Sequence, residues 1–379
     1  MLTPTGVTAT EYWNAIKSGN ATHVRMTFTG QNIVLDDSDV ELSGIYITDA
    51  LNTDTDLRFG KSVMKELSTK IIISDKTKKL RWYDEFKLEF GVEINGTTNW
   101  VTIGYFTGET PQHVTNERVV DFNAYDRMQV FETSAYYFAQ RLRNTGYPIT
   151  SINIYHALCD YVGIGYTAGD EICTTHEVEE EPEGLEDMSC REILELLAGA
   201  MGCYAKIDST GNCKLIWFSD HTDYEITPHE EFAIRNNNIN DAYTWDEFDQ
   251  LTWDEADGYV WNDIAGYQEM YNIDVMRVSQ SGEWFTDYPE MYHVSTNQYR
   301  LISPFVSGPV NYYNRVVGLG GYVPLMVDCI GNWLVEAGDI ITVYVEDKTL
   351  KTPIFYRTLH WYDTVDDTYE VTGNKKRKE

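Results

Sequence analysis

Alternation of apolar and polar residues in the first third of the chain constrains the fold most strongly. Six successive runs are rich in β-branched and aromatic residues and are bounded by Gly, Asp or Asn: 23–30, 32–37, 43–51, 80–94, 99–109 and 117–126. A period of two is typical of strands with one buried face, and the bounding residues favour turns. The tract therefore predicts a barrel or sandwich, interrupted by one short helix-like piece at 60–67.

Helical periodicity replaces this alternation in four places. The first is 8–19, where Thr8 and Glu11 have the spacing of a capping box. The other three follow the strands, at 134–143, 151–163 and 189–202. In the last of them, Ser189 and Glu192 repeat the capping-box spacing ahead of an apolar stripe. We expect a group of helices after the first β-rich tract.

A predicted hairpin follows these helices. Two apolar runs, 203–208 and 213–219, flank Ser209-Thr210-Gly211, which favours a tight turn. An acidic loop at 177–187 separates the second and third of these helices, and the chain becomes β-rich again from 271 onward. The pattern indicates an α-rich insertion that returns to the first β-rich part, followed by a second β-rich part.

A short acidic and aromatic repeat lies between the two β-rich parts. Trp245, Trp253 and Trp261 recur every eight residues, each followed by Asp or Asn and then by an acidic residue. Steps of eight residues rotate the tryptophans apart by about 80° on a straight helix, and their internal spacing of three does not suit a strand. The repeat therefore predicts a chain of short turns, and the three tryptophans are candidate interaction residues.

The charge of the chain argues against a nucleic-acid-binding protein. It carries 29 Lys and Arg against 60 Asp and Glu, a formal net charge of −31. Binding of phosphates without regard to sequence needs a basic surface. An acidic surface suits a protein that DNA passes without sticking, and it also serves solubility alone.

Other classes of protein find little support in the sequence. The first residues lack the charged and apolar regions of a secretory signal, and no apolar run approaches the roughly 20 residues that span a bilayer. Six cysteines occur without a CxxC pair, which indicates buried thiols made in a reducing cytoplasm and no zinc site: Cys159, Cys173, Cys190, Cys203, Cys213 and Cys329.

No catalytic motif stands out, and we expect no enzyme activity, metal or cofactor. HExxH, G-x-S-x-G and phosphate-binding loops are all missing from the sequence. Carboxylate pairs such as Glu336 with Asp339 are expected by chance in so acidic a chain. A calcium loop of the EF-hand type would need an acid where Trp253 stands. Aromatic residues make up 13% of the chain, so a carbohydrate-binding surface is an alternative, although tyrosine and tryptophan also fill β cores.

Four stretches together resemble one family. They are 39–73, 100–132, 189–216 and 333–373, and the residues that carry the resemblance include Gly104, Phe106, Ala124, Tyr125, Asp126, Met128, Ala337, Gly338, Asp339, Pro353, Ile354 and Gly373. In this order and spacing they are similar to the baseplate or tail-tip hub proteins of tailed bacteriophages and phage-tail-like particles, including the hub region of tail-associated lysins.

The resemblance implies a structural role in the virion, at the tail tip or baseplate. Hubs of this family are trimers in which each subunit supplies two tube-like β-barrel domains, so that three chains adapt a sixfold tail tube to a threefold tip or spike. The implied partners are the distal tail or tail-tube protein ring, the tape measure protein and the tip or spike protein. Viral DNA would pass through the lumen without specific binding, and the chain would not insert into a membrane. The resemblance supplies no catalytic residues.

We therefore expect a mainly β, α+β chain with two antiparallel β-barrel domains and an α-rich insertion domain. The first barrel domain is expected at 1–130 together with 203–235, and the α-rich insertion domain at 131–202. The tryptophan repeat forms an insertion or linker at 236–270. The second barrel domain is expected at 271–379, with a small inserted part at about 300–335 and a basic tail. Acidic side chains would line the channel. Two alternatives are a carbohydrate-binding tail component that adsorbs to the host through the tryptophan repeat, and a cell-wall hydrolase.

Overall fold

The computed structural model describes most of the chain outside its centre. The described residues are 2–52, 60–113, 118–171, 174–182, 184–226, 235–236, 277–278, 284–285, 325–345, 348–361 and 365–370. Trp245, Trp253 and Trp261 lie outside these ranges, so the role of the tryptophan repeat stays a prediction.

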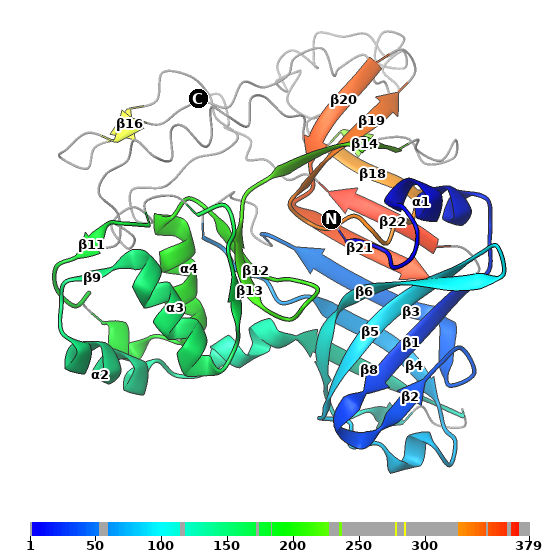
Figure 1. Ribbon diagram of the computed structural model, residues 1–379, viewed down its shortest axis with the longest axis horizontal. Coiled ribbons are helices and arrows are strands. Elements are labelled where there is room, and N and C mark those ends of the chain that lie inside the picture. Colours follow the sequence, from blue (N-terminus) through cyan, green and yellow to red (C-terminus); the bar gives the residue numbers. More distant parts are fainter. Residues whose placement is uncertain are drawn as a thin grey trace, which may run out of the picture.

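A long antiparallel sheet dominates the fold (Figure 1). Its 12 strands follow the order β15-β18-β22-β21-β3-β4-β8-β6-β5-β1-β2, with β7 paired to β8. They are β1 (Thr22–Phe28), β2 (Ile33–Leu35), β3 (Val40–Ala50), β4 (Glu66–Ile72), β5 (Glu85–Ile94), β6 (Thr97–Gly108), β7 (Gln112–His113), β8 (Val119–Asp126), β15 (Arg235–Asn236), β18 (Leu325–Ile330), β21 (Tyr356–Trp361) and β22 (Val365–Glu370). The six runs predicted before Asp126 all contain strands of this sheet.

Strands from the two ends of the chain meet in the middle of this sheet. β21 pairs with β3 in register, from Ile45 opposite Trp361 to Ala50 opposite Tyr356. The mainly β, α+β class is confirmed. Within the described residues, however, the sheet is open, with β15 and β2 at its two ends. The two closed barrels are therefore not seen in these strands.

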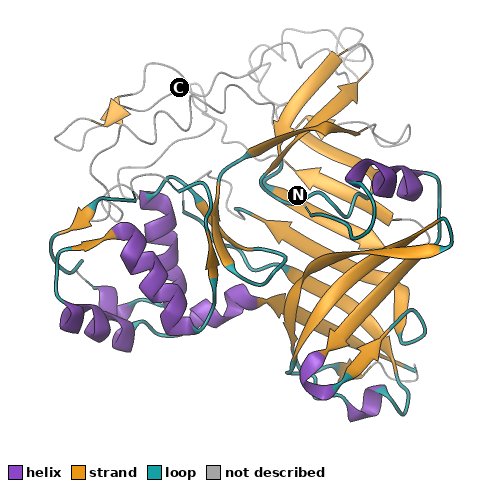
Figure 2. Cartoon of the chain, viewed as in Figure 1, coloured by secondary structure: helices purple, strands orange, loops and turns teal. Residues whose placement is uncertain are grey.

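The helices after Asp126 gather in a separate lobe beside the sheet (Figure 2). They are α2 (Tyr136–Thr145), α3 (Ser151–Val162) and α4 (Cys190–Ala200), together with the short 3-10 helices η3 (Arg127–Glu132) and η4 (Leu185–Asp187). The capping box of α4 forms as predicted, because Ser189 Oγ accepts from Glu192 N at 3.2 Å and Glu192 Oε2 accepts from Ser189 N at 2.7 Å.

The predicted hairpin belongs to this helical lobe. β12 (Tyr204–Ile207) pairs with β13 (Cys213–Ile216), which also pairs with β10 (Tyr166–Thr167). In a second small sheet, β9 (Ile149–Thr150) pairs with β11 (Glu177–Val178). Buried residues of the hairpin share one hydrophobic core with the helices. The described cysteines are buried and form no disulfide, in line with the sequence prediction.

Smaller elements complete the described chain. The first helix, α1 (Ala9–Lys17), has the predicted Thr8–Glu11 capping box. The remaining strands are β14 (Ser219–Ile226), β19 (Asp339–Val345) and β20 (Lys348–Pro353), which form one sheet, and β16 (Arg277–Val278) with β17 (Trp284–Phe285). The other short 3-10 helices are η1 (Thr29–Gln31) and η2 (Thr77–Lys79). Among the described residues, the longest apolar helical stretch falls short of a membrane span.

The helix-like piece expected at 60–67 is wrong. Ser62 instead bridges Ala205 of β12 in parallel, and β4 begins at Glu66. Gly60 has φ +79°, and a Cβ there would overlap the backbone of α4 at Gly199. Close packing against α4 thus overrides the local helical pattern, and only glycine fits this approach.

Candidate functional site: a buried ionic junction and an acidic sheet face

One loop between β18 and β19 connects the two hydrophobic cores of the molecule. Trp333 and Leu334 are buried in the core beneath the large sheet. Val335 and Ala337, which follow directly, are buried in the core shared with the helical lobe. Residues 331–338, here called the junction loop, therefore lie where sheet and lobe meet.

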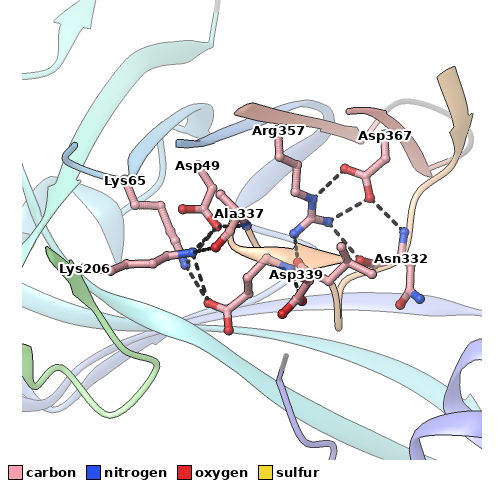
Figure 3. Close-up of polar contacts among 10 residues, drawn as sticks. Asp49, Lys65, Lys206, Asn332, Ala337, Asp339, Arg357 and Asp367 are labelled. Carbon is pink, nitrogen blue, oxygen red and sulfur yellow. Dashed lines mark hydrogen bonds and ion pairs between the residues drawn. The ribbon is translucent and has the colours of Figure 1, made fainter. Parts of the chain in front are cut away.

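Asp49 and two lysines lie against this loop, and Glu336 within the loop supplies a second carboxylate (Figure 3). Lys206 Nζ lies 2.7 Å from Asp49 Oδ2 and donates to the carbonyl oxygen of Ala337 at 3.0 Å. Lys65 Nζ lies 3.3 Å from Glu336 Oε1 and 3.9 Å from Asp49 Oδ2. Asp49 Oδ2 also accepts from Ala337 N at 3.1 Å. The side chains of Asp49 and both lysines are at most 7% exposed, and that of Glu336 is 16% exposed.

An arginine holds the other half of the loop. Arg357 forms a two-pronged pair with Asp367, with Nε to Oδ1 and Nη2 to Oδ2 both at 2.8 Å. Its guanidinium also donates to the carbonyl oxygens of Asn332, at 3.0 Å, and Val335. Asp367 accepts from Asn332 N at 2.9 Å and from Tyr369 OH at 3.0 Å. Paired charges with their remaining hydrogen bonds satisfied are the form in which ions are tolerated in a protein interior.

The ion pairs keep these buried groups charged. Burial alone would raise the pKa of Asp49, but Lys206 and Lys65 outweigh it and the pKa is lowered. Burial would likewise lower the pKa of Lys65, but Asp49, Glu336 and Asp126 raise it. Within the described residues, no three His, Cys, Asp or Glu side chains gather as metal ligands would. The arrangement suits a structural junction.

Asp126 is the exception within the junction. It is 3% exposed and ends β8, where its carboxylate accepts from Met128 N at 3.0 Å and caps η3. Burial raises its pKa to about 7, although Lys65 acts in the opposite direction. Lys65 acts on Asp126 through its charge, while the hydrogen bond that the Asp126 carboxylate accepts comes from the backbone N–H of Met128.

The four stretches that carry the family resemblance all contribute to this junction. Asp49 and Lys65 lie in 39–73, Asp126 in 100–132, Lys206 in 189–216, and Glu336 in 333–373. Sequence reasoning named Asp126 only as part of a motif and did not single out the lysines. It also set aside the pair Glu336 and Asp339 as chance, yet Asp339 Oδ2 accepts from Glu336 N at 2.9 Å and closes the turn before β19.

The exposed face of the large sheet is the second candidate site. Across β22, β21, β3, β4 and β8 the outward residues pair in register; one row runs Asp366, His360, Tyr46, Ser68 and Asn123. Tyr46 and His360 stack at 3.9 Å. The outward carboxylates are Glu41, Glu66, Asp121, Asp366 and Glu370. Lys70, 3.9 Å from Glu41, is the one Lys or Arg among the outward residues described on these five strands. Arg25 on β1 and Lys87 on β5 lie farther along the sheet, each paired with Glu89. The part of the face formed by β22, β21, β3, β4 and β8 is therefore acidic.

Comparison with known proteins gives a match in structure. No family model matches the chain, and no curated protein matches its sequence. The 43 kDa tail protein of prophage MuSo2 from Shewanella oneidensis is similar with a TM-score of 0.51 and 13% identity, over 92% of this chain and 98% of that chain. A tail protein from Neisseria meningitidis MC58 is similar with a TM-score of 0.52 and 8% identity, over 94% of this chain and 97% of that chain.

In both comparisons the matched region covers nearly all of this chain and nearly all of the other protein, so the similarity concerns the complete architecture. At these identities it is a likeness of fold. The chain therefore has the fold of phage tail proteins, and the resemblance predicted from its sequence is confirmed at that level.

Proposed function

We propose that the chain is a structural hub protein of a phage tail tip or baseplate. The observation that carries the proposal is the continuous sheet in a chain with the fold of phage tail proteins. Strands β3, β4 and β8 from the first part and β18, β22 and β21 from the last part lie side by side in it. Each chain thus offers two groups of strands, and three chains would offer six, which adapts a sixfold tube to a threefold tip.

In this proposal the acidic sheet face lines the channel. DNA phosphates would be repelled by the carboxylates of Glu66, Asp121 and Glu370, whereas a basic wall would hold the DNA. Viral DNA would pass without specific binding. The helical lobe would lie on the outside, and contacts would be made with the tail-tube ring, the tape measure protein and the tip or spike protein. Trp245, Trp253 and Trp261 would anchor a neighbouring tail protein. The role requires no catalysis by this chain.

The purified protein is expected to form a trimeric ring. Light scattering should give a mass of about 131 kDa, three times the 43.6 kDa of one chain. Negative-stain images should show a threefold ring with a central hole. A monomer at all concentrations up to about 100 μM, with no rings in the images, would contradict the proposal, because a closed ring needs matching contacts on every subunit.

Reversal of charge on the sheet face is expected to impair DNA delivery. Particles that carry Glu66→Lys, Asp121→Lys and Glu370→Lys should assemble but lose at least about tenfold in titre, since each added cation adds a phosphate contact that retards the DNA. The measurement is the titre relative to particle number, with DNA release followed in parallel.

A matched control has the same change in net charge at exposed sites elsewhere. Asp75→Lys, Glu179→Lys and Glu180→Lys alter a turn beside the sheet and the acidic loop of the lobe, and these residues are exposed. The control should keep the wild-type titre. Equal losses in both triple variants would show that the sheet face has no special relation to the DNA.

A further inference from the structure

A run of positive charge follows the acidic sheet face directly in the sequence. Residues 375–378, Lys-Lys-Arg-Lys, are the one run of four successive Lys or Arg residues in the chain, and are here called the basic segment. β22, a strand of the acidic face, ends at Glu370, so four residues separate the strand from the basic segment. The place where the segment is attached decides which acidic side chains it can reach.

Three carboxylates lie at the end of the face where β22 stops. Glu370 lies opposite the first residue of β21, which in turn lies opposite the last residue of β3. Glu66 begins β4 and lies opposite Tyr125, near the end of β8. Glu109 follows β6, and its N–H donates to Asn123 O of β8 at 2.9 Å. Burial, a hydrogen bond with Glu66 and the charges of Glu66 and Glu109 raise the pKa of Tyr125 to about 12, so its hydroxyl stays protonated near pH 7.

The described cations around this end of the face have other partners. Lys70 pairs with Glu41 towards the opposite end of β4. Lys65, just before β4, belongs to the buried junction, and its side chain is 5% exposed. Arg127, just after β8, forms a two-pronged pair with Glu85. The three carboxylates at this end therefore present a negative surface that suits a basic partner.

The connection between β22 and the basic segment is long enough to cross the face. A chain spans at most about 3.6 Å per residue, so residue 375 lies within about 18 Å of Glu370 and residue 378 within about 29 Å. Neighbouring strands are about 4.8 Å apart, which places β6 about 24 Å from β22 across the sheet. The acidic loop 177–187 instead lies around β9 and β11, on the side of the helical lobe away from the sheet (Figure 1). The reach of the segment thus favours the sheet face.

We propose that the basic segment docks on this end of the acidic face of its own chain, with its cations against the carboxylates of Glu66, Glu109 and Glu370. A short tether raises the local concentration of the segment to the millimolar order, so several individually weak surface pairs can form together. The docked segment is a reversible cover over one end of the face, and Asp121 and Asp366 stay outside it. Docking depends on charge and tether alone and stands whether or not the protein serves as a tail hub.

Limited trypsin digestion of the full-length protein tests the docking. Trypsin cuts after Lys and Arg, and mass spectrometry of the intact chain follows cleavage within the basic segment. Charges act over about 30 Å at about 10 mM salt and over about 3 Å at about 1 M. The segment should be cut at least about fivefold more slowly at the lower salt concentration, after correction with a free peptide of residues 371–379. Equal corrected rates at the two concentrations would overturn the proposal.

Removal of the three carboxylates should release the segment. The variant Glu66→Gln, Glu109→Gln and Glu370→Gln keeps the size of each side chain and removes its charge. At low salt, cleavage of its basic segment should be at least about fivefold faster than in the wild-type protein. An unchanged rate would contradict docking at this end of the face.

A matched control removes three exposed negative charges elsewhere. The variant Asp75→Asn, Glu179→Gln and Glu180→Gln changes the turn beside the sheet and the acidic loop of the lobe. Cleavage of its basic segment should proceed at the wild-type rate. An equal acceleration in both triple variants would mean that net charge alone controls trypsin, and the docking site would be refuted.

Cross-linking identifies what occupies the face. A carbodiimide joins a lysine to a carboxylate in direct contact, and the experiment uses a mixture of isotopically light and heavy wild-type protein. Links from the basic segment to Glu66, Glu109 or Glu370 should form within single chains and weaken at high salt relative to the Lys70–Glu41 link. Links mainly to 177–187, or mainly between light and heavy chains, would overturn the proposal in favour of another surface or a second copy.

Discussion

The Asp49→Ala variant is expected to lose about 3–5 kcal/mol of its free energy of unfolding, the usual cost of removing one partner from a buried ion pair. The truncation leaves Lys206 and Lys65 with Glu336 as their nearest remaining carboxylate and removes the acceptor of Ala337 N. Two buried ammonium groups then share the carboxylate of Glu336, whose side chain is 16% exposed. Chemical denaturation at pH 7 gives the measurement.

A surface pair provides the control. Asp75 and Lys78 form a pair at 3.4 Å in which the aspartate side chain is 97% exposed. Asp75→Ala should therefore change the free energy of unfolding by about 0–1 kcal/mol. If Asp49→Ala costs no more than this, the junction charges are not what holds the sheet and the lobe together.

Removing both charges of the Asp49–Lys206 pair distinguishes two effects. One is the cost of leaving a buried charge without its partner, and the other is the contribution of the ion pair itself to stability. The double variant Asp49→Asn with Lys206→Met leaves Lys65 facing Glu336 and keeps a side-chain oxygen near Ala337 N. Its loss of unfolding free energy should be smaller than the sum of the losses in the two single variants. The coupling energy in this double-mutant cycle should be about 1–3 kcal/mol. Additive losses would mean that the two groups act independently.

Local pattern was enough to predict most elements of the fold, because strands and helices are set by short-range periodicity. The alternation in 80–94 and 117–126 led to β5 and β8, and the spacing of Ser189 and Glu192 gave the start of α4. Local pattern does not determine which strands pair with each other. β3 and β21 lie far apart in the sequence and no local pattern records that they meet, so the sequence could not show that the first and last parts share a sheet.

The ionic junction was hidden for a physical reason. Lys206 alternates with Ala205 and Ile207, which on a half-buried strand would place its ammonium in water. β12 is instead covered on both sides, and all its residues are buried. Lys65 lies in a segment with a helical pattern whose real conformation is fixed by contact with α4. The residue type alone does not show whether a charged side chain is buried or exposed, because burial depends on the tertiary fold.

The Trp333→Ala variant is expected to lose about 3–5 kcal/mol of its free energy of unfolding, comparable to Asp49→Ala but for a different reason. Trp333 is fully buried, and its ring centroid lies 4.9 Å from that of Trp361, 5.0 Å from Phe90 and 6.2 Å from Tyr12. Truncation would leave a cavity that the surrounding strands cannot fill, since Arg357 holds the neighbouring loop backbone in place. Thermal and denaturant unfolding measure the loss.

Two further variants, Trp333→Phe and Tyr83→Ala, test whether lost packing causes the loss of stability in Trp333→Ala. Trp333 Nε1 has no hydrogen-bond partner among the described atoms, so phenylalanine gives up only volume and should recover at least half of the loss. Tyr83 is 65% exposed, and its truncation should stay within about 0.5 kcal/mol of wild type. Because the same loop carries both Trp333 and Glu336, the Trp333→Ala and Asp49→Ala losses should couple rather than add. Strict additivity would mean that the loop does not transmit strain between the two cores, and that core packing and ion pairs stabilise its two halves separately.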